Sequence, residues 1–118
     1  MPNINKFLII ISVLFILFGC SHLESKYEQM TSEETADNYY IVWNERKYTC
    51  FGVIDYKDVG QQIGIVDNDK DNRIYEVKGY SNKEWLISYY YSGEMDSYML
   101  FKEVNVKKIP EDLKKLKI

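Results

Sequence analysis

The sequence predicts a mainly β protein: an N-terminal signal peptide and polar tether, then a small antiparallel sheet or partly open barrel of about six strands, then a short C-terminal helix. From Tyr39 onward, aromatic and β-branched residues alternate with clusters of turn residues, which is typical of short strands. The intervals between these stretches are too short for the crossovers of about a dozen residues that parallel strands need. Pro110 stands at a first helical position, followed by Leu113 and Leu116 on one side, which predicts the helix.

The N-terminal segment, residues 1–19, is typical of a lipoprotein signal peptide. Lys6 precedes an apolar run from Phe7 to Phe18 that is interrupted only by Ser12. This run fits the roughly 7–15 residues of a signal-peptide core and falls short of the roughly 20 that a membrane-spanning helix needs. It ends in Leu-Phe-Gly-Cys at Cys20, which resembles a lipobox, with Phe18 where a smaller residue is usual. The resemblance implies cleavage after residue 19, lipidation of Cys20 and a place on the extracytoplasmic face of the cell membrane.

The remaining 99 residues, 20–118, are enough for one domain with a modest core. They carry 14 Lys and Arg against 18 Asp and Glu, a net charge of −4. This balance disfavours nucleic acid as a partner, because nucleic-acid recognition depends on clustered basic residues. Attraction to anionic lipid head groups is not expected either, so a partner would be neutral or cationic.

Two residue types limit the possible chemistry. If Cys20 is lipidated, Cys50 is a lone thiol that has no disulfide partner, and we expect a small buried side chain within a strand. His22 is the only histidine and lies two residues after the anchor, outside the expected domain. Histidine-based catalytic triads and histidine-containing metal sites are therefore not expected in the folded part.

Along the chain, residues 20–38 are polar and predict a tether that is disordered or only partly helical. The domain is expected to span residues 39–118. Asn44–Arg46 is a tight turn, Asp55–Gly60 a loop with room for one helical turn, and Asp67–Asn72 a polar loop. A hairpin loop is expected at Ser92–Asp96. The expected strands are Tyr39–Trp43, Lys47–Ile54, Gln62–Val66, Arg73–Lys78, Glu84–Tyr91 and Ser97–Val106.

One acidic loop resembles a calcium-binding sequence. Asp67, Asp69 and Asp71 match positions 1, 3 and 5 of an EF-hand loop, but Lys78 stands where the bidentate glutamate belongs. The flanking residues also predict strands rather than helices. We therefore predict a solvated turn and no metal site, with these three aspartates as the weak alternative.

Tyrosine and tryptophan are unusually dense between residues 39 and 98. Strand alternation would place Trp85, Ile87, Tyr89 and Tyr91 on one face of their strand. Most of these aromatic residues are expected to build the core. Because consecutive aromatics occupy both faces, some must be exposed, and exposed tyrosine suits peptide or sugar binding. The candidate ligand surface consists of Tyr80, Tyr90, Tyr91 and Tyr98.

The chain resembles small surface lipoproteins of low-GC Gram-positive bacteria. The resemblance rests on the turn Trp43–Tyr48, Ile63-Gly64 on a short strand, Ile74–Gly79, and the hydrophobic strand from Trp85, and it covers roughly residues 39–101. The layout is distantly similar to that of the lipoproteins that protect producers of nisin and subtilin from their own peptide. Those are membrane-tethered β domains that intercept a cationic peptide. Their motifs do not match position by position, so no functional residue is carried over.

The predicted function is a non-catalytic binding or accessory role at the cell envelope, with a peptide or an envelope protein as the partner. The alternative is immunity through sequestration of a cationic antimicrobial peptide. An envelope hydrolase is the third hypothesis, and the carboxylate pairs do not distinguish themselves from ordinary surface charge. The sequence has no Gly-rich phosphate loop, nucleophile elbow or CxxC motif, so no catalytic residue and no cofactor is predicted.

Overall fold

Seven strands, one turn of 3-10 helix and one short α-helix make up residues 26–91 and 97–118, the part of the chain that this computed structural model describes. In chain order they are β1 (Glu28–Glu34), β2 (Tyr39–Trp43), β3 (Arg46–Ile54), η1 (Tyr56–Asp58), β4 (Val59–Val66), β5 (Asp69–Val77), β6 (Trp85–Tyr90), β7 (Tyr98–Glu103) and α2 (Glu111–Lys114). The predicted mainly β fold with a short C-terminal helix is confirmed. The predicted signal peptide, Cys20 and the Ser92–Asp96 loop lie outside the described residues.

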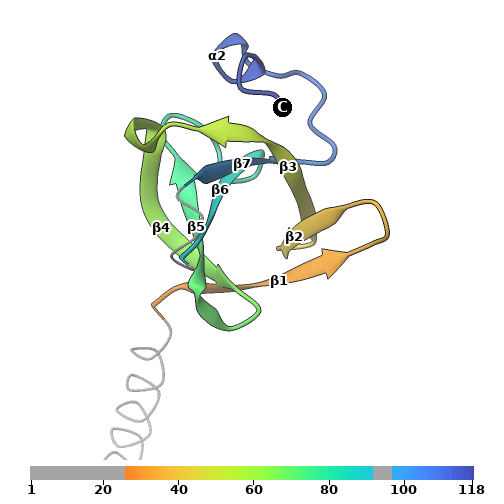
Figure 1. Cartoon of the computed structure of the whole chain (residues 1–118), viewed down its shortest axis with the longest axis vertical. Helices are drawn as coiled ribbons and strands as arrows, with labels where there is room; N and C mark the ends of the chain where they lie inside the picture. Colours follow the sequence, from red (N-terminus) through yellow and green to blue (C-terminus); the bar gives the residue numbers. More distant parts are fainter. Residues whose placement is uncertain (1–25, 92–96) are drawn as a thin grey trace, which may run out of the picture.

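The strands close into a barrel in the order β1-β2-β3-β7-β6-β5-β4 (Figure 1). Every pairing is antiparallel except the one between β1 and β4, where Met30 lies opposite Val66 in a parallel register. Most antiparallel neighbours follow one another in the chain, whereas β3 pairs with the distant β7, and β1 and β4 are also far apart in the chain and meet at the seam. The barrel is thus closed rather than partly open, and it has one strand more than the six expected.

Strand β1 corrects the expectation that residues 20–38 form a tether, because strand structure begins at Glu28, eleven residues before Tyr39. Met30 is the only buried residue of β1, so the sequence shows no amphipathic alternation there. Instead β1 is held by its main chain and by Asp67. Met30 O accepts a hydrogen bond of 2.9 Å from the Asp67 N–H, and both the N–H and the hydroxyl of Ser32 donate to the Asp67 carboxylate.

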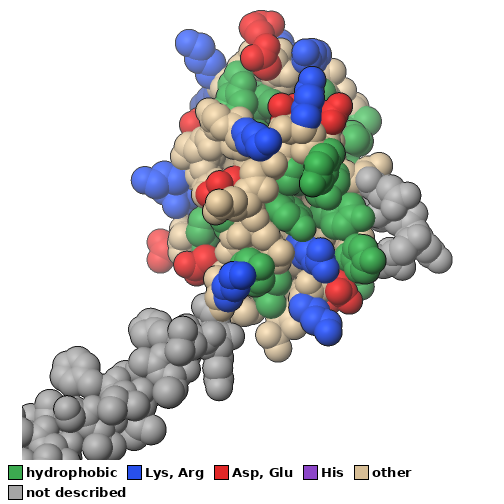
Figure 2. All heavy atoms as spheres, turned by 90° about the vertical axis from the view of Figure 1, so that its left-hand side faces the viewer, with side chains coloured by type: hydrophobic (Ala, Val, Ile, Leu, Met, Phe, Trp, Pro, Cys, Tyr) green, Lys and Arg blue, Asp and Glu red, His purple; other side chains and the backbone are tan. Residues whose placement is uncertain are grey.

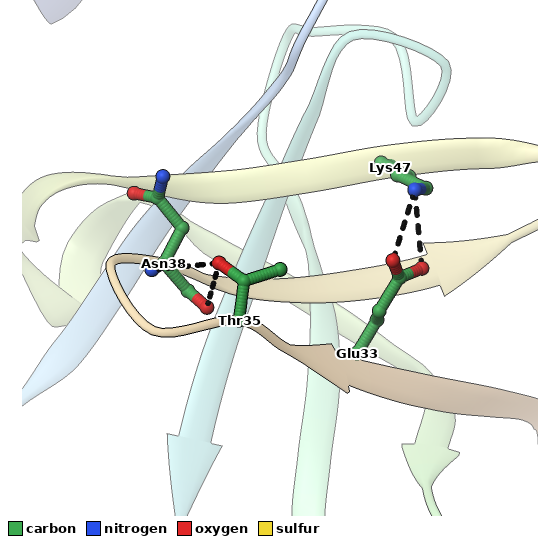
Figure 3. A network of polar contacts seen from close by, with 4 residues as sticks. All are labelled: Glu33, Thr35, Asn38 and Lys47. Carbon is green, nitrogen blue, oxygen red and sulfur yellow. Dashed lines mark hydrogen bonds and ion pairs between the residues drawn. The ribbon is translucent and has the colours of Figure 1, made fainter.

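Polar contacts fix the β1–β2 hairpin (Figure 3). The Thr35 hydroxyl donates to Asn38 O at 3.3 Å and accepts from the Asn38 N–H at 3.1 Å. Lys47 Nζ on β3 lies 3.1 Å from the Glu33 carboxylate on β1, so this ion pair reaches across β2 (Figure 3). Each of its side chains is 47% exposed, and an exposed pair of this kind contributes at most about 1 kcal/mol.

Two hairpins use two-residue turns with positive φ at both central positions. The φ angles are 50° and 64° at Asn44 and Glu45, and 54° and 57° at Asp67 and Asn68. Such turns match the right-handed twist of paired strands, and Asn and Asp tolerate this conformation better than most residues. The predicted turn after Trp43 is confirmed. The predicted Asp67–Asn72 loop is wrong beyond its first two residues, because Asp69 already belongs to β5.

Buried side chains form two clusters on opposite faces of the sheet. The first fills the barrel and takes one residue from every strand: Met30, Ile41, Tyr48, Val66, Ile74, Leu86 and Phe101. The second includes Trp85 and Ile87, which flank Leu86 in β6 and therefore point outward. Leu113 of α2 packs on this outer cluster, together with Ile109 and Leu116. The chain after β7 thus covers part of the outer surface of the barrel.

Candidate functional site

Five tyrosines gather on the outer surface of β5, β6 and β7, and we call them the tyrosine face: Tyr56, Tyr75, Tyr89, Tyr91 and Tyr98. Strand alternation explains the grouping, because Tyr75 lies opposite Ile87 in the β5–β6 register and so shares the outward side of β6 with Tyr89. Tyr98 begins β7, and Tyr56 reaches the group from η1. Figure 2 shows hydrophobic side chains, tyrosine included, gathered in one area on the β4 side of the barrel, with basic side chains beside them.

Tyr98 is the centre of this face. Its ring stacks on that of Tyr89 with a centroid distance of 4.5 Å and an interplanar angle of 22°. Tyr56 and Tyr75 lie 5.7 Å and 6.0 Å from the same ring at steeper angles. Burial beneath these neighbours, reinforced by their own hydroxyls, raises the pKa of Tyr98 above its ordinary value. The rings therefore hold one another in place before any ligand arrives.

The outer members of the face remain accessible: the exposed fraction is 72% for Tyr56 and 57% for Tyr91. Tyr89 and Tyr91 are 6.4 Å apart, so the aromatic surface continues past the end of β6. Neighbouring exposed aromatic side chains form a continuous apolar surface that a binding partner can cover.

Arg73 borders the face. Its guanidinium lies 5.0 Å from the centroid of the Tyr91 ring, within the range of a cation–π contact. A side-chain hydrogen bond with Tyr75 raises the pKa of Arg73 further, so it stays charged. Beside it is a shallow hollow of about 510 Å³, whose lining includes the basic side chains of Lys70 and Arg73 and the acidic side chain of Asp71. The tyrosine face thus joins an aromatic surface to one fixed positive charge.

The four predicted ligand residues divide between different surroundings. Tyr91 and Tyr98 belong to the tyrosine face. Tyr90 is 45% exposed but points to the other side of β6, because neighbouring residues of a strand face opposite ways. Tyr80 is partly buried against the outer cluster. Three members were missed: Tyr56, Tyr75 and Tyr89. Alternation from Trp85 would have found Tyr89, whereas Tyr56 and Tyr75 required the register.

Two of the three aspartates of the calcium alternative have carboxylates with structural roles of their own. Asp67 accepts hydrogen bonds from Ser32, and Asp69 Oδ1 accepts one of 3.0 Å from the Asp71 N–H. Within residues 26–91 and 97–118, no three metal-ligating side chains lie close enough to hold an ion.

Cys50 lies in β3 as predicted, but the expectation of burial is wrong because its side chain is exposed. The register of β3 against β7 shifts between Cys50 and Gly52, which interrupts the alternation of buried and exposed positions. Although the side chain of Cys50 is exposed, its partial burial within the sheet raises the pKa of the thiol. An exposed thiol that is largely protonated is a poor nucleophile.

Comparison with known proteins finds no match: no family model, no curated protein and no solved structure is significantly similar to this chain. The resemblance to Gram-positive surface lipoproteins stays a prediction from the sequence motifs. In the described ranges, the only α-helix is the single turn of α2, and no helix is long and apolar enough to cross a membrane.

Chemically, the tyrosine face is suited to binding. A tyrosine ring offers a large flat contact area at the cost of only two side-chain torsions, and its hydroxyl both donates and accepts hydrogen bonds. Rings that already contact one another lose little further freedom when a ligand covers them. The flat rings can stack on a sugar ring or on the side chains of a peptide, while the hydroxyls bind polar groups at the edge.

Proposed function

We propose that this protein is a lipid-anchored binding protein on the extracytoplasmic face of the cell membrane, and that the tyrosine face is its binding surface. The anchor is Cys20, as the lipobox-like sequence predicts. The observation that carries the binding role is the packing of Tyr56, Tyr89, Tyr91 and Tyr98 into one partly exposed group. Aromatic surface left open to water in this way is typical of interaction sites.

The chemistry of the face favours an uncharged partner, such as a glycan of the envelope or a neutral peptide segment. Arg73 already lies over Tyr91, so a cationic peptide approaching this ring would be repelled by the guanidinium. Sequestration of a cationic antimicrobial peptide by the tyrosine face is therefore the weaker candidate.

The anchor is tested by replacing Cys20 with alanine. A single acyl chain binds membranes only marginally, whereas a diacylglyceryl thioether supplies two chains. We expect Cys20→Ala either to release the protein into the medium or to leave the signal peptide attached. Cell fractionation shows whether the protein is in the membrane or in the medium, and mass spectrometry of the protein shows whether the signal peptide has been removed. A correctly processed, membrane-bound Cys20→Ala variant would refute the anchor.

The binding surface is tested by cross-linking the lipidated protein to its partner on intact cells. The most exposed members of the face, Tyr56 and Tyr91, are replaced with alanine, because their loss disturbs the stacked centre least. We expect the double variant to capture at least about tenfold less partner, which corresponds to roughly 1.4 kcal/mol of binding free energy. Tyr90→Ala is the matched control, since Tyr90 is similarly exposed on the opposite side of β6. Equal capture by all three proteins would refute the assignment.

A further inference from the structure

The surface beside the point where the chain enters the barrel combines an aromatic ring with basic side chains. Tyr27 stands immediately before β1, and its side chain lines the hollow of about 510 Å³ together with Lys70 and Arg73. Lys26 Nζ lies 5.6 Å from the centroid of the Tyr27 ring, within the range of a cation–π contact. We call these four residues, Lys26, Tyr27, Lys70 and Arg73, the entry surface.

The entry surface is held near the proposed lipid anchor by the length of the chain. Seven residue steps separate Cys20 from Tyr27 (27 minus 20), and a chain of that length spans at most about 25 Å. A small domain is about 30 Å across, so the entry surface is held closer to the lipid than the far side of the barrel is. Figure 1 shows the C-terminus, marked C, at the opposite end of the barrel from the start of β1. A barrel tied to the membrane at Cys20 therefore meets the bilayer with the entry surface first.

The side chains of the entry surface suit the boundary between lipid and water. Tyrosine is enriched at this level of a membrane, because its ring is apolar and its hydroxyl stays in contact with water. Lysine and arginine extend their cationic groups to the phosphates of the head groups, lysine as a point charge and arginine through paired hydrogen bonds. Ile65, which is half-buried, adds apolar area to the lining of the same hollow.

Two carboxylates lie beside these cations. Asp71 lines the same hollow, and Glu28 follows Tyr27 in the chain. Three cations against two carboxylates leave a net charge of only +1, on a domain that is acidic as a whole. Charge would therefore attract the free domain to a membrane only weakly. Strong attraction is not needed, because a short tether gives the entry surface a roughly millimolar effective concentration at the bilayer.

We propose that the entry surface docks on the head groups of the bilayer that holds the anchor, with Tyr27 at head-group level and with Lys70 and Arg73 bound to lipid phosphates. This inference rests on the proposed anchor at Cys20. It adds an orientation, because the barrel then lies against the membrane on one defined side instead of turning freely on its tether. Since Arg73 also borders the tyrosine face, that face is presented close to the membrane, where its partner must be within reach.

The test uses the full lipidated protein in vesicles of phosphatidylcholine whose chains are brominated near the head group, because bromine quenches a tryptophan that touches it. Tyr27→Trp places the probe in the entry surface. Ile118→Trp, at a residue that is 80% exposed and at the other end of the barrel, is the matched control. Both proteins carry Trp43→Phe, and the remaining Trp85 is only 1% exposed and so does not meet the lipid. We expect the quenched fraction to be at least about threefold larger for the entry-surface probe.

Charge reversal separates docking from mere closeness to the membrane. Lys26→Glu combined with Lys70→Glu should lower the quenching of the Tyr27→Trp probe at least about twofold, because lipid phosphates repel carboxylates. The control is Lys114→Glu combined with Lys117→Glu, two exposed lysines of the chain end around α2, and this change should leave the quenching as it was.

Three outcomes would overturn the proposal. Equal quenching of Tyr27→Trp and Ile118→Trp, in a protein whose mass shows the lipid on Cys20, would mean that the barrel has no preferred side while the anchor stands. Quenching that charge reversal does not change would remove the phosphate contacts. A protein without lipid on Cys20 would remove the anchor and this docking with it. Capture of a partner by the tyrosine face is measured separately, so the two surfaces fail independently.

Discussion

Gly52 gives the sharpest test of how the C-terminal segment, residues 107–118, lies on the barrel. A Cβ atom at this position would stand 1.9 Å from Leu116 O and 2.7 Å from Leu116 C. Real Cβ atoms do not approach backbone this closely, and neither β3 nor the segment can yield by rotating a side chain. The Gly52→Ala substitution must therefore push the segment away from β3, together with the bridge between Gly52 and Lys117.

The expected loss of stability has two parts. Inserting a methyl group into a packed site typically costs about 1–3 kcal/mol. Displacing the segment also exposes Leu113, which is 4% exposed in the fold, and complete burial of a leucine side chain is worth about 1.5–3 kcal/mol. We expect a decrease of about 2.5–6 kcal/mol in the free energy of unfolding, or roughly 10–48 °C in the melting temperature of a domain of this size.

The assay is urea unfolding monitored by tryptophan fluorescence. A Trp43→Phe background leaves Trp85 as the single tryptophan, so the signal comes from the outer cluster alone. Because Trp85 is 1% exposed beneath the outer cluster, its emission in the native state should shift to longer wavelength when the segment moves. Gly79→Ala is the control: nothing lies within 4 Å of its Cβ, and its φ of 83° makes it purely a strain variant. A Gly52→Ala protein that loses less than about 1 kcal/mol with unchanged emission would refute this account.

Three other predictions follow from single side chains. Burial raises the pKa of Tyr48 to about 12, so the folded state prefers the neutral phenol. The free energy of unfolding should therefore be unchanged below pH 10 and fall as the pH rises towards 12. Urea unfolding at a series of pH values measures this. Asp67→Ala should cost about 0.5–1.5 kcal/mol, because it removes the exposed hydrogen bonds from Ser32 and water can take their place. The loss should be equal in Ca²⁺ and Mg²⁺ at matched ionic strength, and a loss specific to Ca²⁺ would restore the metal alternative. Cys50 should react completely with maleimide without denaturant, but more slowly at neutral pH than free cysteine; no labelling of the native protein would contradict its exposure.

The sequence predicts best where local chemistry decides the structure. The turn after Trp43 is set by Asn44, a residue that tolerates positive φ, between two aromatic-rich stretches. The outward line of Trp85, Ile87 and Tyr89 follows from period-two alternation alone. Both features depend on residues close together in the chain, which is why they need no knowledge of the rest of the fold.

The missed features depend on long-range pairing. Glu28–Glu34 has the composition of a polar linker, and only its main-chain pairing with β2 and β4 makes it a strand. The closure of the barrel depends on this same strand. A second, outer cluster was not predicted, because alternation within a strand does not show that Leu113 and its neighbours in the C-terminal segment pack on the outward side of Trp85 and Ile87. A signal was present in the spacing of Ile109, Leu113 and Leu116, but it predicts only an apolar side and not where that side docks.

The tyrosine face and the covered area around Trp85 arise from one property of the barrel, which is that β6 and β7 carry apolar residues on both sides. The interior needs one side only, and the outer side must be covered or be compatible with water. Around Trp85 the C-terminal segment covers it. Beyond Ile87 the segment does not reach, and tyrosines take over, because a ring with a hydroxyl can pack on the cluster and still meet water. Tyr75 and Tyr98 contact both regions, so the covered area and the open tyrosine face are two halves of one outer surface.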